Sequence, residues 1–155
     1  MRTHLVKAVG HIRFARADEV GELEELQRRS SMVWEQYRDQ LVAHPDAIEL
    51  PVGVIRDQRV RVAVAGHRTL GFSTVIPIGE HVSEIDALFV EPDWMAQGVG
   101  RALMDDAIAR ARASGVLRLE VTAKPAAGFY ERVGFVTIGR ASTQFGPAVR
   151  MHRVL

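Results

Sequence analysis

The stretch that decides the fold is EPDWMAQGVGRALMDDAIARA, residues 91–111, which follows an apolar run ending at Val90. Two glycines, Gly98 and Gly100, stand where an amphipathic helix is expected to begin. The first amides of a helix have no partner within it and carry partial positive charge. A helix that begins with little side-chain bulk is therefore suited to bind an anion, and the question is which one.

Three interpretations of this segment compete. The first is a tight turn in which glycine supplies a positive φ and nothing binds. A Walker phosphate loop is excluded because no Gly-Lys-Ser/Thr is present. A dinucleotide-binding turn has Glu120 at a suitable distance, but Leu103 occupies the third glycine position and the segment EPDWMAQ separates Val90 from Gly98. The chain after Glu120 is also too short for the second half of a doubly wound sheet.

Composition bounds the class of protein. A length of 155 residues, with 47% hydrophobic and 25% charged residues, predicts a single domain over residues 1–155. The formal net charge is +1 with both signs interspersed, so we expect no nucleic-acid partner. The absence of cysteine excludes disulfides and thiolate metal sites and fits a reducing compartment, so we expect no metal and a cytoplasmic location.

The hydropathy pattern predicts no membrane-spanning segment. No apolar run approaches the roughly 18 residues of a membrane span. The N-terminal stretch, residues 1–20, lacks the continuous apolar core and small-residue cleavage site of a signal peptide. We therefore expect neither a membrane partner nor a secretory leader.

Hydrophobic periodicity predicts an α+β fold with one central crossover. Helices are expected in residues 19–44, beginning near Asp18 and broken near Ser30 and Ser31, and in 99–115 and 126–133. Strands are expected at 11–17, 59–65, 70–78, 81–90, 116–123, 135–140 and 148–155. The second and third of these strands form an antiparallel hairpin.

Two motifs resemble those of a known family. LFVEPDWMAQGVGRALM, residues 88–104, is similar to the acetyl-coenzyme A motif of the GNAT superfamily of N-acetyltransferases, in which Val-x-Pro is followed by Gln/Arg-x-x-Gly-x-Gly/Ala. This chain fills those positions with Val90, Pro92, Gln97, Gly100 and Ala102. GFYERVGF, residues 128–135, resembles the second signature, with Tyr130 on a short helix. The two motifs stand in the family's order and spacing, within a matching succession of elements.

The resemblance implies a mixed central sheet, with antiparallel N-terminal strands and one splayed parallel pair, flanked by helices. It implies an acetyltransferase that moves an acetyl group from acetyl-coenzyme A to a primary amine of a small molecule or peptide. The amine attacks directly in a ternary complex. A non-catalytic acyl-coenzyme A-binding or regulatory module with the same fold is the alternative, and a homodimer is left open.

The resemblance also implies where the cofactor lies. Its pantetheine arm would pair, like an added strand, with the backbone of Leu88, Phe89 and Val90. Its pyrophosphate would lie on the amides at the helix start, at Gln97, Gly98, Val99, Gly100, Arg101 and Ala102. Arg101 is either a ligand of the 3′-phosphate or a solvated helix arginine. Many members have an Asn before the Phe-Tyr pair, but residues 122–130 contain none, and Lys124 is a further candidate for phosphate.

The leaving thiolate needs an acid, and Tyr130 is the candidate by family position, near the coenzyme sulfur. The alternative is a tyrosine packed in the core beside Phe129. By the same resemblance the early helices cover the acceptor. There Trp34 and Tyr37 are expected to face the core, and Arg38 is either suited to an acceptor carboxylate or an ordinary surface arginine.

The acceptor ammonium, with a pKa near 10.4, must lose a proton. Glu84 and Asp86 stand two residues apart on one strand, so both project from the same face, and each discourages the ionisation of the other, which is expected to raise the pKa of one of them. Both are candidate bases, and Glu84 ranks first by its place relative to Val-x-Pro. The alternative is a solvated strand face whose carboxylates pair with Arg59 or Arg61.

Overall fold

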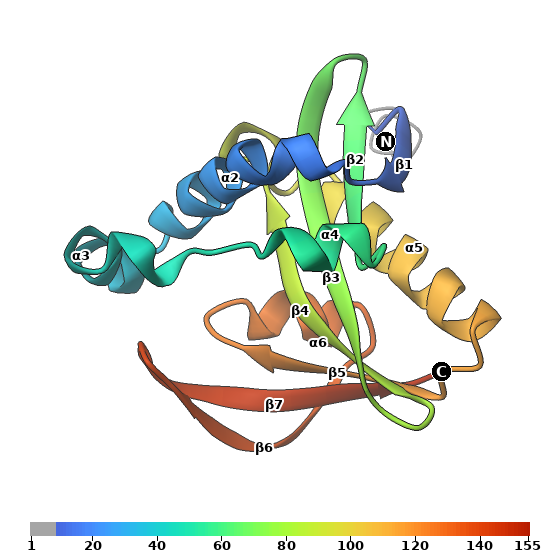
Figure 1. Cartoon of the computed structure of the whole chain (residues 1–155). Coiled ribbons are helices and arrows are strands. Elements are labelled where there is room, and N and C mark those ends of the chain that lie inside the picture. Colours follow the sequence, from blue (N-terminus) through green and yellow to red (C-terminus); the bar gives the residue numbers. More distant parts are fainter. Residues whose placement is uncertain (1–8) are drawn as a thin grey trace. The chain divides into compact units, whose positions relative to one another are not determined.

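The computed structural model describes residues 9–155, and Figure 1 labels its elements. Residues 1–8 of the stretch that predicts no signal peptide lie outside the described residues. The α-helices are α2 Val20–Met32, α3 Glu35–Ala43, α4 Val52–Arg56, α5 Val99–Ala113 and α6 Ala127–Arg132, and short 3₁₀ turns are η1 Ala17–Glu19, η2 Pro45–Ala47 and η3 Pro92–Trp94. The strands are β1 His11–Phe14, β2 Val60–Ala65, β3 Arg68–Gly79, β4 Val82–Val90, β5 Arg118–Ala123, β6 Val136–Thr143 and β7 Gly146–Val154.

The strands form a mixed sheet, hydrogen-bonded in the order β1-β2-β3-β4-β5-β7-β6. β2 pairs antiparallel with β1 and β3, and β7 pairs antiparallel with β5 and β6. β4 and β5 run parallel, with residues 82–85 beside 118–121, and α5 is the crossover between them. The predicted fold class, a mixed sheet with one parallel pair and flanking helices, is confirmed.

Two compact units divide the chain. One comprises the described residues up to Thr74 together with Ala87–Leu103, and the other comprises Val75–Asp86 and Met104–Leu155. β3, β4 and α5 each contribute residues to both units. A single domain over residues 1–155 stays a prediction.

The core of the first unit follows from two sequence periods. β2 alternates arginine and valine before its small-residue end, and α2 carries Leu23 and Leu26 at helical spacing. Both leucines are almost fully buried, and such burial contributes about 1.5–3 kcal/mol for each side chain. The buried cluster comprises Ala15, Leu23, Leu26, Leu50, Ile55, Val60, Val62, Val64 and Phe72.

In the second unit, alternation along β5 separates an apolar face from a charged one. Leu119, Val121 and Ala123 are buried. Arg118, Glu120 and Thr122 project from the opposite face because successive strand residues point to opposite sides. This second face carries the charged side chains of the candidate site.

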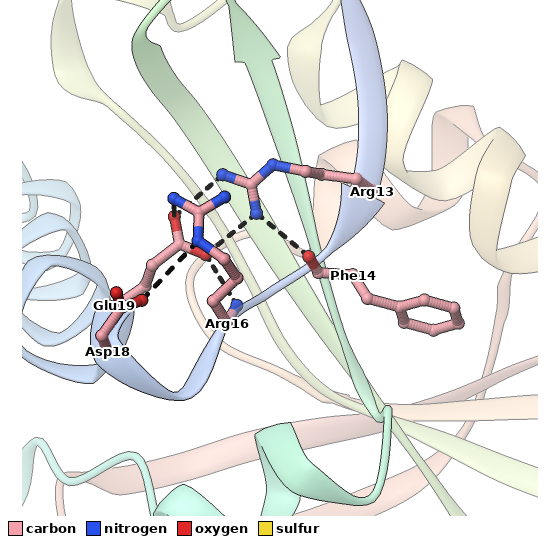
Figure 2. A network of polar contacts seen from close by, with 5 residues as sticks. All are labelled: Arg13, Phe14, Arg16, Asp18 and Glu19. Carbon is pink, nitrogen blue, oxygen red and sulfur yellow. Dashed lines mark hydrogen bonds and ion pairs between the residues drawn. The ribbon is translucent and has the colours of Figure 1, made fainter.

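A network of charged side chains joins β1 to η1 (Figure 2). The Glu19 carboxylate accepts two 2.9 Å hydrogen bonds from the Arg13 guanidinium and one of 2.7 Å from the Arg16 backbone N–H. The Arg13 fork also donates to the Phe14 carbonyl. Asp18, near which we expected the helix to begin, is an exposed acid in the first turn and lies 3.7 Å from Arg16, whereas the Glu19 carboxylate accepts the Arg16 backbone N–H.

Two helix predictions need correction. The break was expected near Ser30 and Ser31, but both serines are buried within α2, and the helices separate at residues 33–34. Residues 45–58, which lie in none of the expected helices or strands, contain α4. This helix has five residues, too few to show a helical period in the sequence.

Candidate active site

The loop between β4 and α5 turns sharply before the helix begins. Ala96 and Gly98 have positive φ angles of 59° and 89°, a conformation that costs a glycine little. The Gln97 side chain closes the loop by donating a 3.0 Å hydrogen bond to the Asp93 carbonyl. Gly98 therefore supplies the positive φ that the first interpretation, a tight turn, requires, and it does so whether or not an anion binds.

The first turn of α5 presents backbone N–H groups beyond this bend. It contains Val99, whose side chain is buried, and Gly100, which adds no side chain outside. Arg101 is exposed. The expectation for Ala102 needs correction, because its amide already donates a 2.9 Å bond to the Gly98 carbonyl. The suitable amides belong to the residues before it.

The end of β4 packs on both of its sides within the first unit. Leu88 and Val90 lie against a cluster that includes Val99 and Leu103, whereas the Phe89 ring lies 5.7 Å from that of Phe72. The strand predicted to pair with pantetheine is thus fixed by its own side chains, and the pairing itself stays a prediction.

Gly71 on β3 is a residue that the sequence analysis missed. A Cβ atom there would lie 2.6 Å from the Phe89 carbonyl oxygen and 3.2 Å from the Leu103 side chain. Glycine is therefore required for β3, the end of β4 and the start of α5 to approach so closely. Its position inside a strand pattern is a signal that could have indicated such an approach.

Glu91, directly after the predicted pantetheine strand, is held by α2. Arg29 donates to both carboxylate oxygens, at 2.7 and 2.8 Å, and this lowers the pKa of Glu91. The Glu91 backbone N–H donates to the Leu70 carbonyl on β3. The start of the loop is thereby fixed to a helix and a strand of the same unit, which the sequence analysis did not foresee.

In the second unit, Glu84 makes an ion pair that the sequence analysis did not assign. Its partner is Arg150 on β7, at 2.5 Å. Within the first unit, Arg61, one of the two partners expected, lies over the Phe14 ring. Pairing of β5 with both β4 and β7 brings Arg150 to this position, and this register is a long-range property of the sheet.

Asp86 differs from Glu84 although both stand on β4. It is exposed, and the described part of the chain offers it no hydrogen bond or ion pair. Surrounding atoms nevertheless desolvate its carboxyl group, and this effect together with the charge of Glu84 raises the pKa of Asp86. The rise expected in the pKa of one carboxylate thus falls on Asp86, with desolvation as its larger cause and the charge of Glu84 as the smaller one.

Tyr130 on α6 is buried, with 6% of its surface exposed. Its ring makes edge-to-face contacts with Phe129 and Phe135, at centroid distances of 5.2 and 5.5 Å. Burial raises the pKa of the phenol well above its ordinary value, so the group stays protonated at neutral pH. Core packing of Tyr130 is observed, and its role as an acid stays a prediction.

Several polar side chains named as candidates are engaged elsewhere. The Lys124 ammonium donates to the Phe145 carbonyl at 2.6 Å, and Arg38 donates to the Met32 carbonyl at the end of α2. Trp34, expected to face the core, is 39% exposed, so that expectation is wrong. Tyr37 is half-buried.

Residues 9–155 contain no group of three or more His, Cys, Asp or Glu side chains placed to hold a metal ion. None of the helices described is long and apolar enough to cross a membrane.

A family model described as an acetyltransferase (GNAT) domain matches residues 56–137, more than half of the chain. The chain belongs to the GNAT acetyltransferase family. Both motifs on which the resemblance rested, residues 88–104 and 128–135, lie within this match.

One curated GNAT protein is similar to this chain over part of its length. The peptidyl-lysine N-acetyltransferase YjaB of Salmonella typhimurium is 38% identical over 63 residues, which are 41% of this chain and 41% of the relative. The alignment thus spans about two fifths of that relative's length.

Solved structures match nearly the whole chain. The PaiA N-acetyltransferase of Thermoplasma acidophilum, in complex with coenzyme A, is 18% identical with a TM-score of 0.74 and covers 94% of this chain and 98% of its own. A GCN5-related N-acetyltransferase of Rhodopseudomonas palustris is 21% identical with a TM-score of 0.78, at 94% and 95% coverage. At such identity these likenesses confirm the fold.

Proposed function

We propose that this GNAT protein transfers an acetyl group from acetyl-coenzyme A to a primary amine of a small molecule or peptide, by direct attack in a ternary complex. The observation that carries the proposal is the positive-φ turn at Gly98, which leads into a first helical turn containing Gly100. A helix start without a side chain at that position accommodates a pyrophosphate without requiring a lysine.

We assign cofactor binding to two segments of the first unit. The backbone of Leu88, Phe89 and Val90 would hold the pantetheine amides, and residues 97–101 would surround the pyrophosphate. The packing of the strand and the bend at Gly98 support this assignment. Arg101, exposed on α5, is the candidate for the 3′-phosphate.

Gly100→Asp tests the pyrophosphate site. The variant places a carboxylate where we propose phosphates bind, so calorimetry should show that the affinity for coenzyme A is lost while the melting temperature changes little. Gly21→Asp is a matched control, because Gly21 is also the second residue of a helix and a Cβ there meets no atom within 4 Å. Equal affinity of both variants for coenzyme A would refute the assignment.

We assign the leaving-group role to Tyr130 and proton removal from the acceptor to the carboxylates of β4, Glu84 or Asp86. A thiol titrates near about 8.5, far below the raised pKa of this phenol. Complete proton transfer from Tyr130 to the thiolate is therefore unfavourable. The phenol suits instead a hydrogen bond that stabilises negative charge as it develops on sulfur.

The function is tested by measuring thiol release from acetyl-coenzyme A with a panel of amines, amino acids and lysine peptides, alongside calorimetry of the cofactor. Lysine peptides are included because the similar Salmonella protein bears the name of a peptidyl-lysine acetyltransferase. Release stimulated by one class of amine, and reduced in Tyr130→Phe without loss of cofactor affinity, supports the enzyme. Cofactor binding without release from any acceptor favours the regulatory module, and no binding at all refutes both.

We also propose that the protein acts in the cytoplasm without a metal cofactor, since the chain lacks cysteine and the assigned roles need no metal. A homodimer is left open as its assembly. Cell fractionation and size-exclusion chromatography would test the location and the assembly.

A further inference from the structure

Charged side chains from three strands meet on one face of the second unit. Glu84 on β4 stands beside Glu120 on β5 in the parallel register, and Thr122 stands beside Arg150 on β7. Two carboxylates on adjacent strands repel each other unless a cation lies between them. Arg150 supplies that cation.

Arg150 uses both ends of its guanidinium fork. Its Nη1 donates to Glu84 and to the Thr122 hydroxyl, at 2.5 and 2.7 Å, and its Nη2 donates to Glu120 at 2.5 Å. Glu120 is also bound by Arg118, at 2.9 Å. A planar guanidinium suits such a bridge, because its donors point in fixed directions toward separate acceptors.

Asp86 lies outside this bridge. It shares the face of β4 with Glu84, is exposed, and makes no hydrogen bond or ion pair within residues 9–155. The two candidate bases therefore differ in availability. Glu84 would have to give up part of an ion pair to accept a proton, whereas Asp86 would not.

This inference rests on the acetyl transfer proposed above. We propose that Arg150 is a positioning residue that holds Glu84 in the bridge, so that Asp86, and not Glu84, receives the proton of the acceptor ammonium. The expected family ranking of Glu84 above Asp86 is thereby reversed for this chain.

The proton balance of the step is complete. The ammonium gives one proton to Asp86, directly or through water, and the neutral nitrogen attacks the thioester carbonyl. The C–N bond forms, the C–S bond breaks, and the thiolate leaves with its electron pair. It is reprotonated with the proton that the nitrogen loses on becoming an amide, and Asp86 releases the first proton to solvent.

Asp86 must be ionised to act, so kcat/KM falls as the pH drops below its pKa. Desolvation and, to a smaller extent, the charge of Glu84 raise that pKa, and Arg150 partly offsets the charge of Glu84. On the face of this unit that carries Asp86, the charged or titratable groups from neighbouring strands are Glu120 and Arg118 of β5 and Arg150 and His152 of β7. Residues 75–79 of β3 contribute none.

Asp86→Asn and Glu84→Gln separate the two bases, because each removes one carboxylate with little change of shape. Asp86→Asn should lower kcat/KM about 100-fold or more, the usual contribution of a general base, and remove the acidic limb of the pH profile. Glu84→Gln should lower kcat/KM less than about tenfold and move the limb to lower pH, because one like charge is lost.

Arg150→Met tests the positioning role, with Arg118→Met as the matched control that touches Glu120 but not Glu84. Carboxyl NMR should show that the pH midpoint of the Asp86 titration rises in Arg150→Met and stays near the wild-type value in Arg118→Met. Arg150→Lys, which keeps the charge, should partly restore the midpoint. If Arg150→Met does not fold, Arg150→Lys supplies the test, because loss of the bridging guanidinium alone should leave the Asp86 midpoint above the wild-type value.

Two results would overturn the inference while leaving the proposed function intact. One is an active protein whose Asp86→Asn variant keeps its acidic limb, and the other is a Glu84→Gln variant as impaired as Asp86→Asn. A wild-type protein that binds coenzyme A but transfers acetyl to no amine would instead refute the proposed function. The carboxyl NMR titration would then still show whether Arg150 controls the pair.

Discussion

The Arg13–Glu19 network of the first unit and the Arg150–Glu84 network of the second use the same ion-pair chemistry in different surroundings. Glu19 is 6% exposed, and its carboxylate is occupied by the Arg13 fork and the Arg16 amide. Glu84 is 27% exposed, and its neighbour Asp86 has no described partner. The first network has no carboxylate left for a substrate, whereas the second leaves one beside it.

Burial, more than the number of ion pairs, distinguishes the structural network around Glu19 from the network that we propose to be reactive. Removing one partner of a buried pair leaves an uncompensated charge at large cost, whereas water replaces a partner at an exposed pair. A carboxylate that water reaches can also exchange protons with a substrate. The two networks should therefore respond oppositely when stability and activity are measured.

Glu19→Gln should cause the largest loss of stability among the carboxylate substitutions in these networks. It leaves the Arg13 guanidinium without its anion in a partly buried position, so we expect a loss of about 3 kcal/mol in the free energy of unfolding. Urea unfolding measures this loss, and kcat of the folded fraction should not change. Asp18→Asn, at an exposed carboxylate in the same turn, is the control and should change stability by less than about 0.5 kcal/mol.

The pH dependence of stability gives this prediction a second readout. The Arg13 fork holds the pKa of Glu19 below its usual range, so the folded state favours the ionised form. The stabilisation is complete above the unfolded-state pKa of about 4.3 and is lost as the pH falls through the folded-state pKa. Wild type should thus lose more stability than Glu19→Gln on acidification, and parallel curves would contradict the assignment.

Glu91→Gln should have an intermediate effect. Glu91 is 16% exposed, but Arg29 is half exposed, so water can solvate the guanidinium when its anion is lost. We expect a loss of about 1 kcal/mol in the free energy of unfolding. Hydrogen exchange of the Glu91 amide, which donates to Leu70, would show whether the loop after β4 loosens. If the free energy of unfolding fell as much as in Glu19→Gln, the exposure of the side chains would not determine how much each ion pair contributes to stability.

The features that the sequence could predict are those that depend on residues close together along the chain. The bend at Gly98, the start of α5 and its end near Gly115 depend on neighbouring residues and were predicted. The strand alternation and the parallel crossover were predicted for the same reason. Signals within about twenty residues of each other are sufficient for these elements.

The ion-pair partners of Glu84 and Glu91 could not be predicted in this way, because they lie far from these residues in the sequence. Arg150 meets Glu84 because β5 pairs with β4 on one side and with β7 on the other, and a shift of one residue would turn it to the opposite face. Arg29 meets Glu91 through the packing of α2. The exposure of Trp34 also depends on where α2 ends, which was predicted two residues early.

Glu84→Gln should have the smallest effect on stability, and it completes the comparison. Arg150 keeps Glu120 and the Thr122 hydroxyl as acceptors, so no guanidinium is left without an anion. We expect a change of about 0.5 kcal/mol or less in the free energy of unfolding. The same variant should nevertheless move the acidic limb of the pH profile, which Glu19→Gln should not. A stability loss equal to that of Glu19→Gln would show that the Arg150 bridge supports the sheet and would remove the distinction between the two networks.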